Sequence, residues 1–131
     1  MLIDANIFLE ILLSQKKAEE CKAILRKIQT GEQKAIISTF TIDTIILSMS
    51  RNKVSIEKIR IFLNSLVNLI GLRMYNINFK DRIMALDLIN KYKLDYEDAI
   101  TLQSAFSSDC KEILSLDKHF DGIKQIKRIE P

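Results

Sequence analysis

Four aspartates, far apart in the chain, are the residues whose type and surroundings could support chemistry. Asp4 and Asp117 each follow a short apolar run, and Asp98 lies in an acidic stretch before another apolar segment. Asp43 is the only charged residue in positions 35–49. Grouped carboxylate oxygens bind hard cations such as Mg²⁺ or Mn²⁺. Because such an ion activates water and offsets charge on a phosphodiester, these acids indicate metal-dependent phosphodiester hydrolysis.

The elements that must position these acids are predicted from the spacing of apolar residues. Only three glycines and one terminal proline interrupt the chain, which favours helices joined by short loops. The predicted strands cover residues 2–3, 35–37, 72–77, 112–116 and 126–129, and the predicted helices cover residues 7–12, 15–29, 40–50, 55–70, 79–92 and 96–106.

The alternation of strands and helices predicts the fold class, an α/β three-layer sandwich (α/β/α) around a central, mostly parallel sheet of four to five strands. Residues 1–131 are predicted to form a single domain. Parallel strands end at one edge, so Asp4 and Asp117 are expected there, and the helices that carry Asp43 and Asp98 start from it. Four carboxylates in one cleft would repel one another unless a cation binds.

Helix capping is the simpler explanation for some of these residues. Asp4 or Asn6 could cap only the helix that follows the first strand. Asp95 is the predicted cap of the helix at residues 96–106, and Asp98 lies in the first turn of that helix. Capping and metal binding are compatible there, because the positive end of the helix dipole stabilises nearby acids.

Asp43 has a more unusual setting. Its neighbours include Ile42 and Ile45, so we expect its carboxylate to be withdrawn from water, which costs free energy unless a partner compensates. The alternative is that Asp43 is stabilised by the helix dipole and by a cap at Ser38 or Thr39.

Composition excludes several classes of protein. The chain has 131 residues, of which 47% are hydrophobic and 28% charged, and its 20 basic and 17 acidic residues give a net charge of +3. This balance permits a nucleic-acid partner without requiring one. Cys21 and Cys110 form no CxxC pair, so neither a zinc site nor a disulfide framework is indicated and a reducing cytoplasm is the expected setting. No apolar run approaches the roughly 20 residues of a membrane span.

Four short motifs resemble those of PIN-domain ribonucleases, including the toxins of VapBC toxin-antitoxin pairs. They are LIDAN at residues 2–6, the 38–43 segment STFTID, YEDA at 96–99 and SLDKHF at 115–120. Their order and spacing extend the resemblance over essentially the whole chain. A receiver domain, which also uses acids at strand ends, is disfavoured because residues 72–78 contain no Asp.

The resemblance implies a metal-dependent endoribonuclease that uses Mg²⁺ or Mn²⁺, acts on RNA and pairs with an antitoxin, and it implies a homodimer. The four aspartates become its catalytic acids, with the metal on Asp4, Asp98 and Asp117. The polar side chains expected to orient them are Asn6, Ser38 and Ser115. The basic side chains expected to hold the RNA backbone are Lys118, His119, Lys124 and Lys127.

The chain departs from the family at Asp43, where the family usually has Glu and therefore a side chain one methylene longer. The alternative function is accordingly a catalytically weak or inactive PIN-like module that binds RNA or protein. Asp95, Glu97 and Asp121 are nearby acids that could compensate, although roles as caps and surface charges are their ordinary explanation. The wide apolar face of residues 55–70 would suit a protein partner.

Overall fold

The computed structural model describes all residues, 1–131, and its centre is a five-stranded sheet. All four strand pairings are parallel, so the predicted fold class is confirmed and the sheet is wholly rather than mostly parallel. The strands, in the spatial order β3-β2-β1-β4-β5, are β3 (Leu72–Tyr75), β2 (Ala35–Ser38), β1 (Leu2–Ile3), β4 (Glu112–Leu114) and β5 (Lys127–Ile129).

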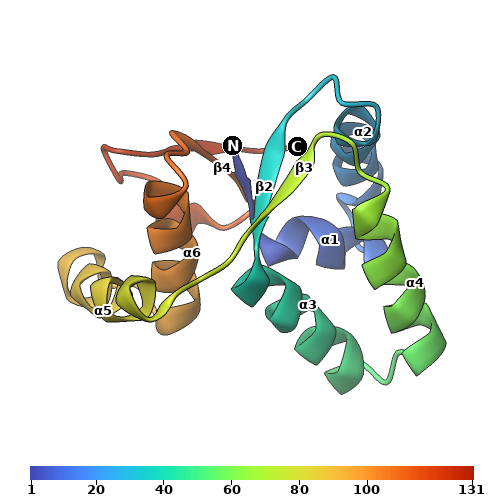
Figure 1. Ribbon diagram of the computed structural model, residues 1–131, viewed down its shortest axis with the longest axis horizontal. Helices are drawn as coiled ribbons and strands as arrows, with labels where there is room; N and C mark the ends of the chain where they lie inside the picture. Colours follow the sequence, from blue (N-terminus) through green and yellow to red (C-terminus); the bar gives the residue numbers. More distant parts are fainter.

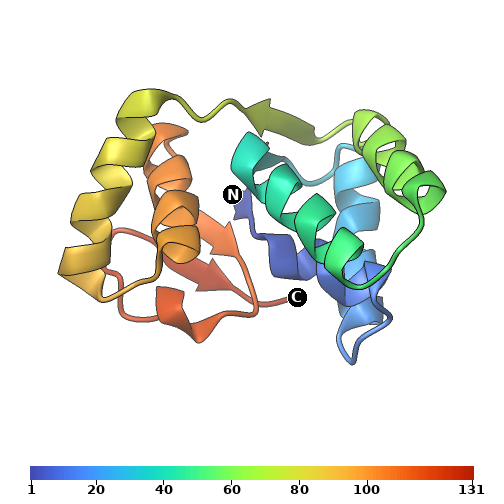
Figure 2. The same ribbon diagram turned by 90° about the horizontal axis from the view of Figure 1, so that it is seen from below.

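Six α-helices and one 3₁₀ turn connect the strands. Helices α5 and α6 lie together on one side of the molecule, and the other four lie on the opposite side (Figure 1; Figure 2). The helices are α1 (Ala5–Leu12), α2 (Ala18–Gln29), α3 (Thr39–Arg51), α4 (Ile56–Val67), α5 (Phe79–Tyr92) and α6 (Tyr96–Ser107), and the 3₁₀ turn is η1 (Lys118–Phe120).

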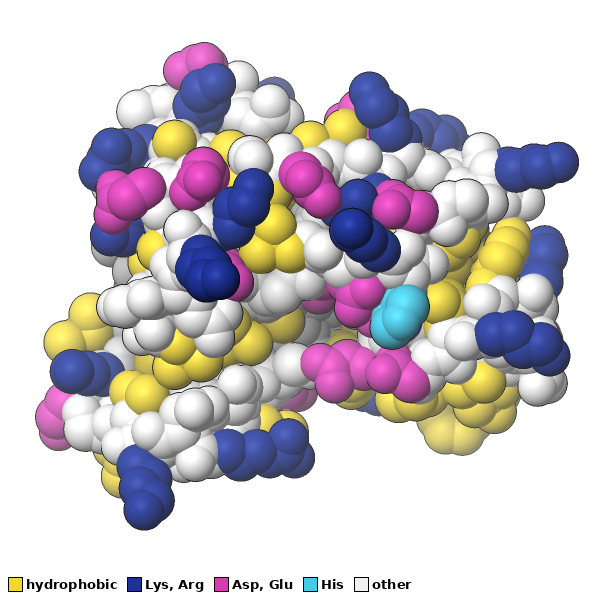
Figure 3. Space-filling model, turned by 180° about the vertical axis from the view of Figure 1, so that it is seen from behind, with side chains coloured by type: hydrophobic (Ala, Val, Ile, Leu, Met, Phe, Trp, Pro, Cys, Tyr) yellow, Lys and Arg dark blue, Asp and Glu magenta, His cyan; other side chains and the backbone are white.

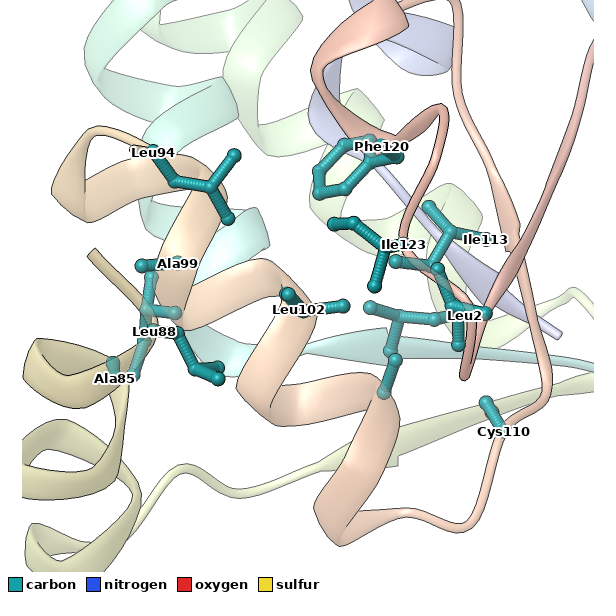
Figure 4. Packing of buried hydrophobic residues seen from close by; sticks show 13 residues of the cluster. Leu2, Ala85, Leu88, Leu94, Ala99, Leu102, Cys110, Ile113, Phe120 and Ile123 are labelled. Atoms are coloured by element: carbon teal, nitrogen blue, oxygen red, sulfur yellow. The ribbon is translucent and has the colours of Figure 1, made fainter. Parts of the chain in front are cut away.

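Alternation along the central strands gives each face of the sheet its own apolar core. Leu2 of β1 and Ile113 of β4 pack with residues of α5, α6 and η1, as Figure 4 shows. Ile3 and Leu114, the next residue of each strand, pack with α1, α2, α3 and α4. Successive side chains of a strand point to opposite faces, so strands buried on both faces must be continuously apolar.

The helix boundaries follow from their caps. Asn78 and Asp81 form a capping box at the start of α5, and the predicted helix 79–92 coincides with α5. Helix α4 begins after its Ser55 cap as predicted, but it ends at Val67, before residue 70. Both cysteines are buried and free, as expected. None of the helices is long and apolar enough to cross a bilayer.

Candidate metal centre

Asp4 is held at the carboxyl end of β1 by three hydrogen-bond donors. The Ala5 amide donates to Oδ1 at 2.6 Å, which makes Asp4 the N-cap of α1. The Ser115 hydroxyl donates to Oδ2 at 2.6 Å, and the Asn6 amide nitrogen donates to the same oxygen at 2.7 Å. The carboxylate therefore has a fixed orientation before any ligand binds.

Burial raises the pKa of Asp4 from 3.8 to about 6. The hydrogen bonds from Ser115 and Ala5 oppose this rise, whereas the negative charges of Asp98 and Asp117 add to it. The Asp4 carboxylate is partly buried, and the charges that act on it, those of Asp98 and Asp117, are both negative. The pKa shift thus reflects a site whose electrostatics favour binding of positive charge.

Ser115 connects the ends of β1 and β4. Its hydroxyl donates to Asp4 and accepts hydrogen bonds from the Asn6 side-chain amide at 3.0 Å and the Asp117 backbone amide at 2.9 Å. Asn6 also accepts a hydrogen bond from the Leu116 amide at 3.2 Å. These contacts support the predicted orienting roles of Asn6 and Ser115, since each bonds directly to an acid or to its backbone.

Asp98, Asp117 and His119 bring three ligand atoms within 4.8 Å of one another. His119 Nδ1 lies 2.9 Å from Asp98 Oδ2 and 3.2 Å from Asp117 Oδ1. Burial raises the pKa of Asp98, with the hydrogen bond to His119 opposing it. That same bond and the charges of the two aspartates raise the pKa of His119. An imidazolium here is a counter-charge for the carboxylates.

The turn that carries Asp117 and His119 is fixed by its own packing. The Asp117 carboxylate accepts a hydrogen bond from the His119 amide at 2.8 Å and caps η1. Phe120 ends the turn and is buried in the core beneath α6, on the same side as Leu94 and Ala99 (Figure 4). A buried aromatic ring thus anchors the exposed part of the site.

Residues 1–126 match the family model described as the PIN domain. The chain belongs to the PIN-domain family. This agrees with the sequence motifs and with the placement of Asp4, Asp98 and Asp117 at one edge of the parallel sheet.

Solved structures with the same fold resemble this PIN domain over nearly its full length. A toxin-antitoxin complex from Klebsiella pneumoniae is 22% identical, with a TM-score of 0.72, over 96% of this chain and 94% of that one. VapC20 of Mycobacterium tuberculosis, a toxin that cleaves the sarcin-ricin loop, is 10% identical, with a TM-score of 0.68, over 93% and 90%.

VapBC2 of Rickettsia felis, bound to a DNA fragment from its promoter, is 12% identical, with a TM-score of 0.70, over 98% of this chain and 96% of that one. A comparison of the sequence with curated proteins found no match. At these identities the structural similarities establish the fold of the PIN domain.

The donor set of this PIN domain fits a divalent cation. Asp4, Asp98 and Asp117 supply carboxylate oxygens, which Mg²⁺ and Mn²⁺ prefer, and His119 adds a nitrogen that Mn²⁺ accepts more readily than Mg²⁺ does. The chemistry of the donor set supports this fit, because ligand atoms of Asp98, Asp117 and His119 lie within 4.8 Å of one another and the charges of Asp98 and Asp117 also act on Asp4.

Asp43 does not have the environment that its neighbours predict. It is exposed to solvent, and its side chain takes part in no hydrogen bond or ion pair, so the expectation of a desolvated carboxylate is wrong. Helix α3 turns Thr41, Ile45 and Met49 toward the core, and Asp43 lies between these positions on another face. Its proposed place in the metal site stays a prediction.

Ser38 caps the helix that carries Asp43 and forms no hydrogen bond with Asp4, Asp98 or Asp117. It is fully buried and caps α3 by accepting a hydrogen bond from the Thr41 amide at 3.0 Å. Its hydroxyl also pairs with the Thr41 hydroxyl at 2.8 Å. The predicted cap is confirmed, whereas a role in orienting the metal ligands stays a prediction.

The basic residues near the carboxyl terminus fall into two groups. Lys118, Lys124 and Lys127 are exposed and form no ion pair, which leaves them free to contact a polyanion. His119 instead contacts Asp98 and so belongs to the acidic cluster. Figure 3 shows this single histidine (cyan) next to acidic side chains (magenta), with Lys and Arg side chains (dark blue) on the same face.

Two of the compensating acids are accounted for by other contacts. Asp95 caps α6 by accepting a hydrogen bond from the Asp98 amide at 2.8 Å, and Asp121 pairs with Arg128 at 2.6 Å. Sequence reasoning missed all the contacts of Arg128, including that of its Nη1, which donates to the Ser115 carbonyl at 3.2 Å. The available signal was an Arg inside a predicted strand with acids on both sides.

Proposed function

We propose that this PIN domain is a metal-dependent endoribonuclease that hydrolyses phosphodiester bonds in RNA. The observation that carries the proposal is the convergence of Asp4, Asp98 and Asp117, from β1, α6 and the segment after β4, on one edge of the sheet. Ligands of parallel α/β sheets bind at that edge. Membership of the PIN-domain family supports the same activity.

The proposed ligands of Mg²⁺ or Mn²⁺ are Asp4, Asp98 and Asp117. When bound, such an ion offsets negative charge on the phosphate and lowers the pKa of a water molecule. Asn6 and Ser115 hold the Asp4 carboxylate in one orientation through hydrogen bonds of 2.7 and 2.6 Å. Asp43 is proposed as the fourth acid, which helps to bind the ion or to orient the attacking water.

RNA is proposed to bind across the face that carries the acids. Lys118 is exposed and unpaired beside Asp117 and His119, Lys124 is exposed in the turn before β5, and the chain has a net charge of +3. Lys127 is also exposed, but it is paired in register with Glu112 at the amino end of β5, away from the acids. Lysine contacts to phosphates make binding salt-dependent, because counterions are released from the RNA. We therefore expect affinity for RNA to fall steeply as salt is raised, and a salt-independent affinity would contradict the assignment of these lysines.

An antitoxin protein is the proposed macromolecular partner, in keeping with the toxin-antitoxin complex from Klebsiella pneumoniae. An apolar groove of about 510 Å³ lies between α3, α4 and β3 and would suit an apolar segment of such a partner. Val67 of α4 lines this groove and is exposed, and Ile61 of α4 and Ile70 in the turn after α4 are exposed as well. Exposed apolar surface of this kind is typical of protein interfaces.

A homodimer is proposed on a separate apolar surface. Phe79, Ile83 and Leu86 are exposed on α5 at helical spacing, with exposed fractions of 78%, 54% and 53%. This stripe lies on the opposite side of the molecule from α4 (Figure 1). Sedimentation measurements of the wild type and of Phe79→Ser would test the dimer independently of any antitoxin.

A catalytically weak module that binds RNA or protein is the second candidate, and the position of Asp43 favours it. This carboxylate is exposed, lacks any contact with the acidic cluster and is shorter than the family's usual Glu. A site that depends on a fourth acid would then bind metal but hydrolyse RNA slowly.

The decisive experiment measures cleavage of total cellular RNA by the wild type, Asp4→Asn and Asp98→Asn, each with and without Mn²⁺. We expect Mn²⁺-dependent cleavage by the wild type and none by the two variants. A matched control is Asp109→Asn, which changes an exposed aspartate paired only with Lys111. Equal cleavage by all proteins would exclude the enzyme.

Mn²⁺ binding separates the two candidate functions. If the wild type is stabilised by millimolar Mn²⁺ but cleaves no RNA, the binding module is supported. If Mn²⁺ neither stabilises the protein nor promotes cleavage, both the metal site and the enzyme are excluded.

A further inference from the structure

Arg128 of the last strand has a mostly buried side chain that pairs with two half-exposed carboxylates, Asp121 and Glu130, beside the site. Its Nε and Nη2 donate to the two carboxylate oxygens of Asp121 at 2.6 and 3.1 Å. Its Nη1 donates to Glu130 at 2.6 Å and to the Ser115 carbonyl at 3.2 Å. The Arg128 side chain is only 11% exposed. The planar guanidinium suits such a geometry because its donors have fixed directions.

Two of the three residues that Arg128 contacts, Ser115 and Asp121, flank the exposed half of the site. Ser115 precedes Asp117 and His119 in the chain, and Asp121 directly follows η1. The guanidinium therefore contacts the segment 115–121 at both its ends. Ser115 is also held through its own amide, which donates to the Ile129 carbonyl at 3.0 Å. Figure 2 shows β5 (red) lying beside β4 at the edge of the sheet.

Ser115 connects Arg128 to the acids of the site. Its hydroxyl bonds to the Asp4 carboxylate and to the Asp117 amide, so the orientation of Ser115 determines how these two acids lie relative to each other. The hydrogen bond from Arg128 to the Ser115 carbonyl fixes that orientation from the opposite side of the chain. Groups of this kind change metal affinity or activity by about 10- to 100-fold when removed.

We propose that Arg128 is a positioning residue that sets the placement of Asp117 relative to Asp4 by clamping the segment 115–121. Its relevance to metal binding rests on the proposed function, whereas the clamping itself does not. The competing explanation is that Arg128 only neutralises Asp121 and Glu130 and thereby stabilises the edge strand.

Three variants separate these explanations. Arg128→Met removes every donor and the charge while keeping a long side chain. The triple variant Arg128→Met/Asp121→Asn/Glu130→Gln also removes the two acids that would be left unpaired, so it should retain the fold. The matched control is Arg73→Met, because Arg73 is an exposed arginine without an ion pair on β3, the edge strand at the other side of the sheet.

The first readout is hydrogen exchange of the Asp117 and His119 amides, measured by NMR without metal or RNA. Both amides donate within the clamped segment, to the Ser115 hydroxyl and the Asp117 carboxylate. We expect exchange at both to rise at least about tenfold in the triple variant, while amides of α3 exchange as in the wild type. Unchanged exchange at Asp117 and His119 would overturn the proposal.

The second readout is Mn²⁺ affinity, measured from the electron paramagnetic resonance signal of the free ion. We expect the triple variant to unfold near the wild-type temperature but to bind Mn²⁺ at least about tenfold more weakly. RNA cleavage should show a lower kcat with KM nearly unchanged, since the exposed lysines remain. If the triple variant is as stable as the wild type and binds Mn²⁺ with wild-type affinity, Arg128 only neutralises Asp121 and Glu130. That result would overturn the proposal.

The two readouts distinguish failure of this inference from failure of the proposed function. If the wild type binds no Mn²⁺, the nuclease proposal fails, but hydrogen exchange still decides whether Arg128 clamps the segment. If Arg128→Met does not fold, the triple variant and the Arg73→Met control still give a complete comparison.

Discussion

Asp4 and Asp43 follow neighbouring strands of the same parallel sheet, yet the structure treats them very differently. Asp4 accepts hydrogen bonds from Ala5, Asn6 and Ser115 and has its pKa raised to about 6. Asp43 is exposed and makes none. The Asp4 carboxylate is therefore oriented before a ligand binds, whereas the Asp43 side chain would have to be ordered by the ligand. The difference indicates that the residues after β1 and β4 form the ordered part of the candidate metal centre. The acid after β2 has no hydrogen bond that fixes its orientation.

The pH dependence of stability should show the largest effect, because Asp4 is buried. Its folded-state pKa, about 6, is above the ordinary value of 3.8, so the folded protein binds this proton more tightly than the unfolded chain does. The contribution of Asp4 to the stability of the metal-free protein is therefore most favourable below about pH 4. It falls as pH rises from about 4 through 6, by about 3 kcal/mol from this group.

Urea unfolding in EDTA at pH 4 to 8, for the wild type and Asp4→Asn, measures this contribution as the difference between the two curves. Saturating Mn²⁺ should abolish the wild type's loss above pH 6, since the ion binds the ionised carboxylate. A difference between the two proteins that does not change with pH would contradict the buried, metal-poised state of Asp4.

The second comparison concerns two buried serines at the ends of strands. Ser115→Ala removes the hydroxyl that bonds to Asp4 and to the Asp117 amide, so we expect Mn²⁺ affinity to fall by about 10- to 100-fold. Ser38→Ala removes the cap of α3, which should cost about 1 kcal/mol of stability. It should leave Mn²⁺ affinity close to that of the wild type.

Titrations of Mn²⁺ and thermal unfolding of both variants provide the test. If Ser38→Ala weakens Mn²⁺ binding as much as Ser115→Ala does, the two sides of the site are equally ordered around the ion. The contrast between β4 and β2 would then be a feature of the metal-free protein alone.

The sequence contained enough information to predict the sheet and the placement of Asp4, Asp98 and Asp117 at one edge of it. Asp4 and Asp117 end apolar runs, and Asp95 caps the helix that carries Asp98; these are local signals that the chain displays directly. The exposure of Asp43 was not predictable in this way, because the apolar and hydroxyl-bearing side chains of α3 are interspersed and mark no single buried face. Which face of α3 is buried is determined by the packing of Thr41, Ile45 and Met49 against the rest of the fold.

Contacts between distant residues were also beyond the sequence patterns. His119 meets Asp98 across 21 positions, and Arg128 meets Ser115 across 13. From the sequence, His119 was grouped with the lysines expected to bind RNA, and no pattern gave Arg128 a role. Only the fold separates the histidine and arginine that support the acids from the lysines that remain free in solvent.

The smallest effect is expected at Asp43, and it most directly tests the asymmetry. Asp43→Asn removes an exposed charge without a partner, so Mn²⁺ affinity should change by less than about threefold. Asp43→Glu restores the side-chain length usual in the family, and its longer reach should raise the rate of RNA cleavage without changing stability.

Cleavage rates and Mn²⁺ titrations of Asp43→Asn and Asp43→Glu should be compared with those of Asp98→Asn. An affinity loss in Asp43→Asn as large as that in Asp98→Asn would mean that α3 shifts toward the acids when the ion binds, because the metal-free carboxylate makes no contact with them. If Asp43→Glu cleaves RNA faster with unchanged Mn²⁺ affinity, the longer side chain helps to orient the attacking water. The short Asp43 side chain would then limit hydrolysis and not metal binding.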